Sequence, residues 1–157
     1  MRGYKLRSIV LFQGVFSVEA ITKIKAAKTT PIFVCEGRPS LEAGKSNSKA
    51  LLIQGITPTV ICDNMAGFLF FKGFVREVVI ACQYADGTGI LCDTGGLILA
   101  VLAKKHKVAL RLLEAEHKKH FLGNPKDLLT LKGFPTASKE THAYVPLVEW
   151  VPAKYLK

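Results

Sequence analysis

The chain has 157 residues, a formal net charge of +10 and 49% hydrophobic residues. At ~100–200 residues per domain, residues 1–157 are expected to form a single domain. The apolar fraction excludes a disordered chain, and no apolar run reaches the ~20 residues that a membrane span needs. The four cysteines form no C-x-x-C pair, which indicates free thiols in a reducing cytoplasm.

Five strand-like runs alternate with helical patterns along the chain. The runs cover residues 7–12, 32–35, 59–62, 77–82 and 108–112. Because they are continuously apolar and separated by helices, they predict a three-layer α/β fold with a doubly wound, mostly parallel, Rossmann-like sheet. About forty C-terminal residues carry four prolines and are expected to form an irregular tail.

Four helices are expected between these runs. The first presents one apolar face, formed by Phe16, Ala20, Ile24 and Ala27. The second covers residues 48–54, and the third begins at Asp63, a residue type that caps helices well. The fourth covers residues 97–105 and is apolar nearly all round, which predicts burial on most of its sides.

The carboxyl ends of parallel strands meet at one edge of a sheet, and ligands bind in the crevice there. Candidate polar groups follow the predicted strands, namely Arg38, Asp63, Cys82 and Gln83. The glycine-rich segment 84–96 is expected to form a loop, which leads to the same edge and ends in a helix start formed by Thr94, Gly95 and Gly96. Free amide groups and the positive end of a helix favour an anion at such a place.

Simpler interpretations exist for each of these features. Asp63 is most simply a helix cap, and the glycines serve turn geometry, since neither G-x-G-x-x-G nor G-x-x-x-x-G-K-[ST] is present. Cys35 and Cys62 are expected in the core, whereas Cys82 and Cys92 are better candidates for exposure at the crevice. The spacing of two histidines could suit a metal, but a solvated segment is the favoured interpretation of residues 116–120.

Four ordered segments resemble the superfamily of the initiation factor 2B subunits and methylthioribose-1-phosphate isomerase. They read CEGRPSLEAGKS (residues 35–46), GITPTVICDNMAG (55–67), TGGLILAVLAKKHKVAL (94–110) and PLVEWVPAKYL (146–156). The resemblance implies the carboxyl-terminal Rossmann-like domain of this superfamily. Its members carry a further N-terminal helical domain, which is expected to be absent here.

The resemblance also implies which groups hold the ligand and move the proton. Where the family has G-A-D-R, this chain has Cys82 in place of the acid, and Asp93 replaces a lysine that faces the phosphate. The implied catalytic candidates are Cys82 and Asp63. The implied ligand-binding candidates are Arg38, Glu42, Gln83, Cys92, Asp93, Thr94, Gly95 and Gly96.

These substitutions weaken the case for catalysis. An unneutralised carboxylate ~4 Å from a phosphate costs about 4 kcal/mol at an effective dielectric near 20, and a helix end returns only ~0.3–1 kcal/mol. Isomerisation also needs a positioned acid and base. The leading hypothesis is therefore a non-catalytic domain that acts by self-association or by binding a protein or a small anionic ligand. No metal or cofactor is expected.

Two alternatives stay open. The first is a pentose 1-phosphate isomerase with a remodelled crevice. The second is an RNA-associated translation factor that uses a basic surface formed by Lys104, Lys105, His106, Lys107, Lys118 and Lys119. The expected partners are a second copy, paired through the apolar helix 63–71, a translation factor, or a chain that supplies the missing N-terminal half. The expected ligand is a sugar phosphate or a nucleotide, and the expected location is the cytoplasm.

Overall fold

Five parallel strands form the centre of the sheet in the computed structural model, which describes residues 5–24 and 29–156. Their spatial order is β3 (Thr59–Ile61), β2 (Ile32–Cys35), β1 (Ile9–Gln13), β4 (Val75–Asp86) and β6 (Ala109–Glu114). The order runs outward in both directions from β1 and β4. This is the doubly wound arrangement that the sequence predicts, with a crevice where the order reverses.

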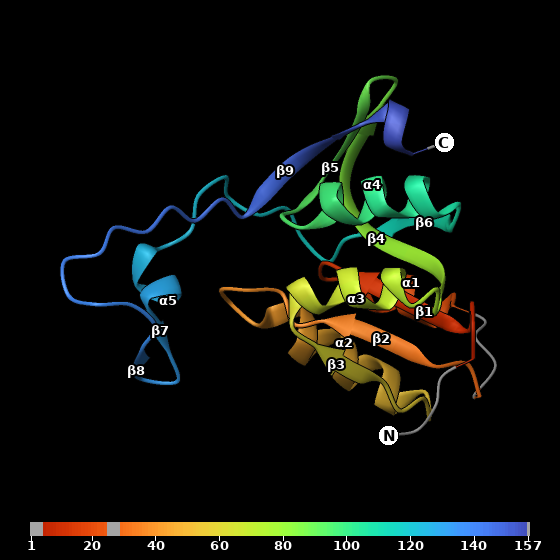
Figure 1. Cartoon of the computed structure of the whole chain (residues 1–157), viewed down its shortest axis with the longest axis horizontal. Coiled ribbons are helices and arrows are strands. Elements are labelled where there is room, and N and C mark those ends of the chain that lie inside the picture. The colour runs from red at the N-terminus through yellow and green to blue at the C-terminus, as the bar shows by residue number, and fades with distance from the viewer. Residues whose placement is uncertain (1–4, 25–28, 157) are drawn as a thin grey trace.

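Alternating side chains of each strand enter two separate cores. Ile9 and Leu11 of β1 pack into one core, together with residues of α3 (Ala66–Phe71) and α4 (Gly96–His106). Val10 and Phe12 pack into the other, together with α1 (Val18–Thr22) and α2 (Glu42–Ile53). Figure 1 shows α3 and α4 in front of the sheet, with α2 behind it. The predicted three-layer fold is confirmed, because helices cover both faces.

A β-hairpin replaces the predicted glycine-rich loop. Strand β4 continues to Asp86 and turns through Gly87 and Thr88 into the antiparallel strand β5 (Gly89–Asp93). Asp86 Oδ1 accepts hydrogen bonds from Thr88 N and Oγ1, both at 2.7 Å. An Asp-Gly pair between two strands is a strong hairpin pattern, so the loop prediction was wrong.

The predicted helices differ in extent from those in the structure. The second starts at Glu42 rather than at residue 48, and the first is short; Ala27 lies outside the described residues. A 3₁₀ turn, η1 (Asp63–Met65), precedes α3. Helix α4 is not buried on most sides, since Ile98 is 65% exposed. No helix among the described residues is both long and apolar enough to cross a bilayer.

The C-terminal region leaves the body and then returns to it. The sequence ends in β9 (Val148–Pro152), which pairs antiparallel with β5, and the 3₁₀ turn η2 (Ala153–Tyr155). Between β6 and β9 the chain projects from the body in Figure 1. This projection contains the short elements α5 (Pro125–Leu129), β7 (Thr130–Leu131) and β8 (Phe134–Pro135). The tail is therefore irregular only in part.

Candidate functional site

The crevice at the carboxyl edge of the sheet is filled by the protein's own side chains around Asp93. The cavity that remains beside Asp93 has a volume of about 20 Å³, which suffices for about one water molecule. A shallower hollow of about 290 Å³ lies next to it, lined by Glu42, His117 and Lys119 among others. The residues that line the smaller cavity come from β1, from the loop after β2, from the end of β5 and from the segment after β6. They are Gln13, Gly37, Arg38, Pro39, Ser40, Asp93, Thr94, Lys119 and Leu147.

Asp93 is neutralised inside this crevice. Its carboxylate is buried, and Lys119 Nζ lies 2.7 Å from Asp93 Oδ2. Gln83 Nε2 donates to Asp93 Oδ1 at 2.7 Å, while Gln83 Oε1 accepts from Lys119 N at 3.0 Å. The sequence predicted an unneutralised carboxylate at Asp93. This prediction was wrong, because Lys119 forms a charge-assisted pair with Asp93.

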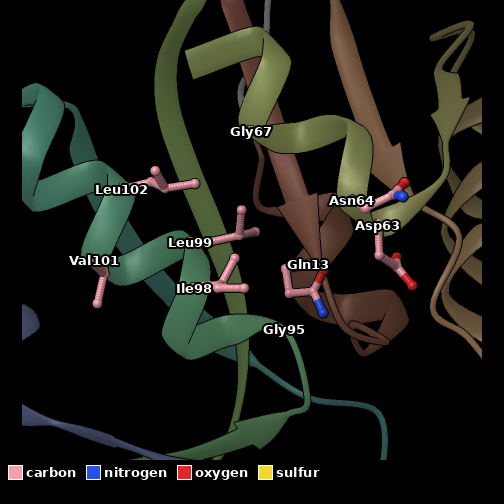
Figure 2. A pocket seen from close by; sticks show the side chains of 9 residues that line it. All are labelled: Gln13, Asp63, Asn64, Gly67, Gly95, Ile98, Leu99, Val101 and Leu102. Atoms are coloured by element: carbon pink, nitrogen blue, oxygen red, sulfur yellow. The ribbon is translucent and has the colours of Figure 1, made fainter. Parts of the chain in front are cut away.

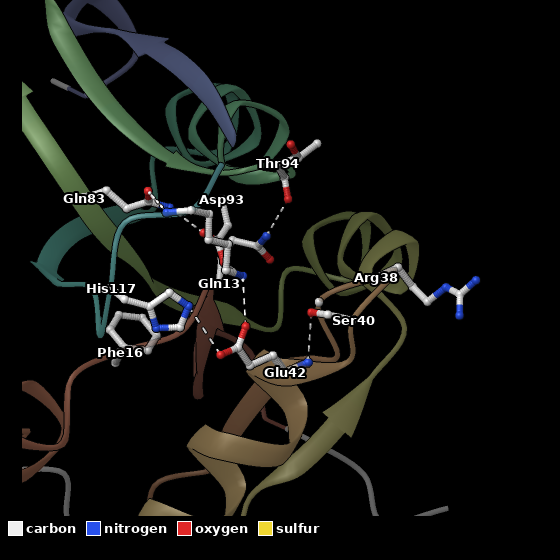
Figure 3. Close-up of polar contacts among 12 residues, drawn as sticks. Gln13, Phe16, Arg38, Ser40, Glu42, Gln83, Asp93, Thr94 and His117 are labelled. Carbon is white, nitrogen blue, oxygen red and sulfur yellow. Dashed lines mark hydrogen bonds and ion pairs between the residues drawn. The ribbon is translucent and has the colours of Figure 1, made fainter. Parts of the chain in front are cut away.

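Glu42 joins the same network from the start of α2. Lys119 Nζ lies 3.6 Å from Glu42 Oε2, and His117 Nε2 lies 3.4 Å from Glu42 Oε1. Figure 3 shows Glu42 and His117 facing each other beside Asp93. The structure thus brings Glu42, Gln83 and Asp93 together, and the segment after β6 closes over them.

The amino end of α4 is occupied by a carboxylate of the same chain. Glu149 Oε1 in β9 accepts hydrogen bonds from Gly95 N at 2.7 Å and from Leu97 N at 2.9 Å. Thr94 turns its hydroxyl away and donates to Pro146 O at 2.8 Å. The amide groups that the sequence offered to an external anion therefore hold Glu149. The physical preference was right, but the anion is internal.

Asp63 does not cap a helix, so the simple interpretation of this residue was wrong. The N-cap position of the turn belongs to Cys62. The Asp63 carboxylate accepts from Gly37 N at 2.9 Å and from Arg38 N at 2.8 Å, and thus fixes the loop after β2. The Arg38 guanidinium extends away from the crevice network (Figure 3), with Nη2 3.4 Å from Leu128 O.

Neither cysteine candidate is set up as a nucleophile. Burial raises the pKa of the half-buried Cys82, whose Sγ lies 3.2 Å from Tyr84 O. Cys92 is fully buried, and burial, together with Glu149 and Asp93, raises its pKa further. A Cβ atom on Gly96 would collide with Cys92 Sγ. The expected exposure of Cys92 was wrong, and a raised pKa keeps both thiols protonated at neutral pH.

The other two cysteines lie in a different part of the fold from the two histidines of residues 116–120. Cys35 lies in the core as expected, but Cys62 is only half-buried. His117 contacts Glu42, and His120 is exposed. Across residues 5–24 and 29–156, no three His, Cys, Asp or Glu side chains converge into a possible metal site.

The sequence did not indicate the roles of three residues in the crevice. The expectation that Lys119 belongs to an exposed basic surface was wrong, because its side chain is mostly buried against Asp93. Gln13 ends β1 and donates from Nε2 to Thr94 O at 2.9 Å; a buried polar residue directly after an apolar strand could have revealed it. Glu149 stands three residues before Pro152 in the motif that resembles the family's ending. Lys119 belongs to a run of charges, and no local pattern separates it from the exposed Lys118.

Comparisons with known proteins agree with this fold. The family model described as the Initiation factor 2 subunit family matches residues 15–157. The chain is 28% identical over 144 residues to methylthioribose-1-phosphate isomerases from Carboxydothermus hydrogenoformans and Syntrophus aciditrophicus. These alignments cover 84% of this chain but only 42% and 39% of the two relatives, so the chain spans well under half of their length.

Two solved structures share the fold. The translation initiation factor eIF-2B, subunit delta, from A. fulgidus has a TM-score of 0.80 and 17% identity, and the match covers 97% of this chain and 51% of that one. The 5-methylthioribose 1-phosphate isomerase from Pyrococcus horikoshii OT3 has a TM-score of 0.73 and 22% identity, covering 96% and 49%. Because the family model spans nearly the whole sequence, the chain belongs to the Initiation factor 2 subunit family.

Proposed function

We propose that this chain is a non-catalytic domain of the Initiation factor 2 subunit family that works by pairing with a second copy. The observation that carries the proposal is the filled crevice, in which Lys119 and Asp93 form an ion pair 2.7 Å long. The cavity beside Asp93, with about 20 Å³, is far below the ~300 Å³ at which small-molecule pockets begin, and the neighbouring open hollow at Glu42 and His117 has about 290 Å³. A pentose phosphate that reaches Asp93 would have to displace Lys119 from it.

The surface that supports pairing is the groove between α3 and α4. It has a volume of about 540 Å³ and is lined mainly by apolar side chains. Figure 2 shows Leu99 and Leu102 on the side of α4 that faces α3, with Gln13 and Asp63 at one end of the groove. The outer rim is also apolar and exposed, and it consists of Met65, Phe68, Phe71, Ile98 and Val101. We call this rim and groove the α3–α4 face.

A second copy fits this face because its two ends differ in charge. Asp63 and Gly95 line the groove where both helices begin. Where the helices end, the Phe70 and His106 rings lie 5.5 Å apart, and Lys72 Nζ lies 5.6 Å from the Phe68 and Phe71 rings. A two-fold axis across the groove places the basic end of one copy at the acidic end of the other. The same face thus complements itself.

Light scattering over a concentration series tests the pairing. The unmodified chain is expected to reach the mass of a dimer, and Phe71→Glu is expected to hold it at the mass of a monomer, since Phe71 is 78% exposed on the face. Leu52→Glu is the matched control, because Leu52 is exposed on α2, on the other layer. A chain that stays monomeric throughout, or a dimer that Phe71→Glu leaves intact, would contradict the proposal.

The isomerase alternative rests on the similarity to methylthioribose-1-phosphate isomerases. It requires Cys82 or Asp63 to handle a proton. The raised pKa of Cys82 and the two amide bonds of Asp63 count against both roles. Turnover of methylthioribose 1-phosphate that Cys82→Ala or Asp63→Asn abolishes would favour the enzyme over the pairing domain.

A further inference from the structure

We propose that the segment of residues 117–147, here called the arm, binds single-stranded nucleic acid, a function independent of pairing through the α3–α4 face. The proposal rests on a juxtaposition that the fold creates: exposed aromatic rings and unpaired lysines alternate along a segment that projects from the body (Figure 1). Stacking rings and cations along one path are the features that proteins use to bind single strands.

The arm has a defined shape although little of it packs on the core. Its two limbs are joined by backbone hydrogen bonds, from Gly123 N to Val145 O at 2.8 Å and from Leu147 N to Phe121 O at 2.9 Å. Near the tip, Thr136 Oγ1 donates to Leu128 O at 2.6 Å. All residues from 130 to 142 are nevertheless exposed. The arm is therefore a preformed platform that lowers the ordering cost of binding.

The charges of the arm favour a polyanion. It carries five lysines but only two acidic residues, Asp127 and Glu140. Among the ion pairs of the described residues, the only arm lysine is Lys119, which the crevice holds. The four other lysines are exposed to solvent; they are Lys118, Lys126, Lys132 and Lys139.

The aromatic rings decide which polyanion fits. Phe121, Phe134 and Tyr144 are 74%, 76% and 77% exposed, and they interleave with the lysines along the arm. The carboxylates of an acidic polypeptide do not stack on exposed rings, whereas every nucleobase has a flat face that can stack on them. The other basic cluster lies at the end of α4. The exposed rings near it, Phe68 and Phe71, are contacted by Lys72 and belong to the α3–α4 face, which the proposed pairing covers.

Fluorescence anisotropy with a labelled 20-nucleotide RNA of alternating C and A, which cannot pair with itself, tests the proposal on the full chain. Binding is expected to weaken steeply with salt, because phosphate contacts release counterions. The triple variant K126Q/K132Q/K139Q is expected to reduce the slope of log affinity against log salt by about 2, at ~0.7 per phosphate contact. Phe134→Leu and Tyr144→Leu are each expected to weaken binding about fivefold or more.

Matched controls separate the arm from general charge. K23Q/K45Q/K49Q removes three exposed lysines of the α1–α2 layer, and Tyr84→Leu removes an exposed ring outside the arm; both are expected to leave the affinity within twofold. Circular dichroism verifies that every variant is folded. The proposal is overturned if the chain does not bind the RNA or if binding does not depend on salt. It is also overturned if K104Q/K105Q/K107Q loses as much affinity as the arm variant, or if Phe134→Leu and Tyr144→Leu leave the affinity unchanged. Displacement of the RNA by poly-glutamate as readily as by unlabelled RNA would contradict it as well.

Discussion

Lys119 holds the crevice together because its ammonium group lies between two carboxylates. It contacts Asp93 at 2.7 Å and Glu42 at 3.6 Å, and its own backbone N–H is fixed by Gln83. Both members of the Lys119–Asp93 pair are mostly buried. A buried pair contributes little net stability when intact, but removing one member leaves an uncompensated charge. The integrity of the crevice therefore depends on Lys119.

Lys119→Met is expected to lower the free energy of unfolding by about 2 kcal/mol, somewhat below the 3–5 kcal/mol for fully buried pairs, since some solvent reaches this one. Adding Asp93→Asn is expected to recover most of the loss, because no charge is then left alone. Urea unfolding of the single and double variants measures this coupling. Lys118→Met, at an exposed neighbouring lysine, is the control and should change stability by less than ~0.5 kcal/mol. Additive single effects would contradict the pair.

The reactivity of the four cysteine thiols tests the surroundings of individual residues in a second way. Burial raises the pKa of Cys82, Cys35 and Cys92, and the Glu36 carboxylate raises that of Cys62. The thiolate is the reactive form, so less of it is present at any given pH than in the unfolded chain.

Alkylation with iodoacetamide at pH 7–8 is therefore expected to be slower for all four cysteines in the folded chain than in urea. Cys35 and Cys92 should react only on unfolding, because both are also buried. Mass spectrometry of the labelled peptides measures the four rates. Selective labelling of Cys82 below pH 7 would contradict the raised pKa and revive a nucleophilic role for this residue.

Helix α4 begins in a tightly packed corner, whereas α3 begins in an open one. Gly96, the first residue of α4, leaves no space for a Cβ atom because Cys92 Sγ lies against it. Gly67, the second residue of α3, lines the α3–α4 groove, and apart from its own helix no atom of the chain lies within 4 Å of where a Cβ would stand. Both glycines lie in the first turn of a helix, but their packing within one chain is opposite.

Gly96→Ala is expected to destabilise the chain by about 1–3 kcal/mol through overpacking, and Gly67→Ala to stabilise it by about 0.5 kcal/mol through the entropy of the unfolded chain. Thermal unfolding measures both. Cys92→Ala should relieve most of the Gly96→Ala defect, since it removes the colliding sulfur. If Gly96→Ala is neutral, or if Cys92→Ala fails to rescue it, the corner is not packed as described.

At the scale of the whole molecule, the fold was largely predictable. Continuous apolar runs between helices predicted the doubly wound, mostly parallel sheet. Four strands were missed. In the main sheet, β5 lies in a glycine-rich segment whose hairpin pattern resembles a loop, and β9 ends at Pro152, a residue that favours edge strands. The other two, β7 and β8, have only two residues each. The projecting arm was not predicted. Residues 130–142 are exposed because no other part of the fold packs against them, and local sequence patterns do not show this.

The site was predictable only in part, because its charges pair over long sequence distances. The strand ends pointed to Gln83 at this edge, and the family resemblance added Asp93 and Glu42, which the structure places beside it. Lys119, which neutralises two of them, lies 26 residues after Asp93 in the chain, and Glu149 reaches α4 from 52 residues beyond Leu97. Periodicity and local motifs carry no information on such contacts.

Side chains fill the crevice around Asp93, and ³¹P NMR of methylthioribose 1-phosphate mixed with the purified chain tests whether it can still convert a substrate. The substrate resonance is expected to stay unchanged in position and area, since side chains fill the space beside Asp93 and the pKa of Cys82 is raised. A growing ketose phosphate resonance that disappears in the Cys82→Ala or Asp63→Asn variant would contradict this expectation.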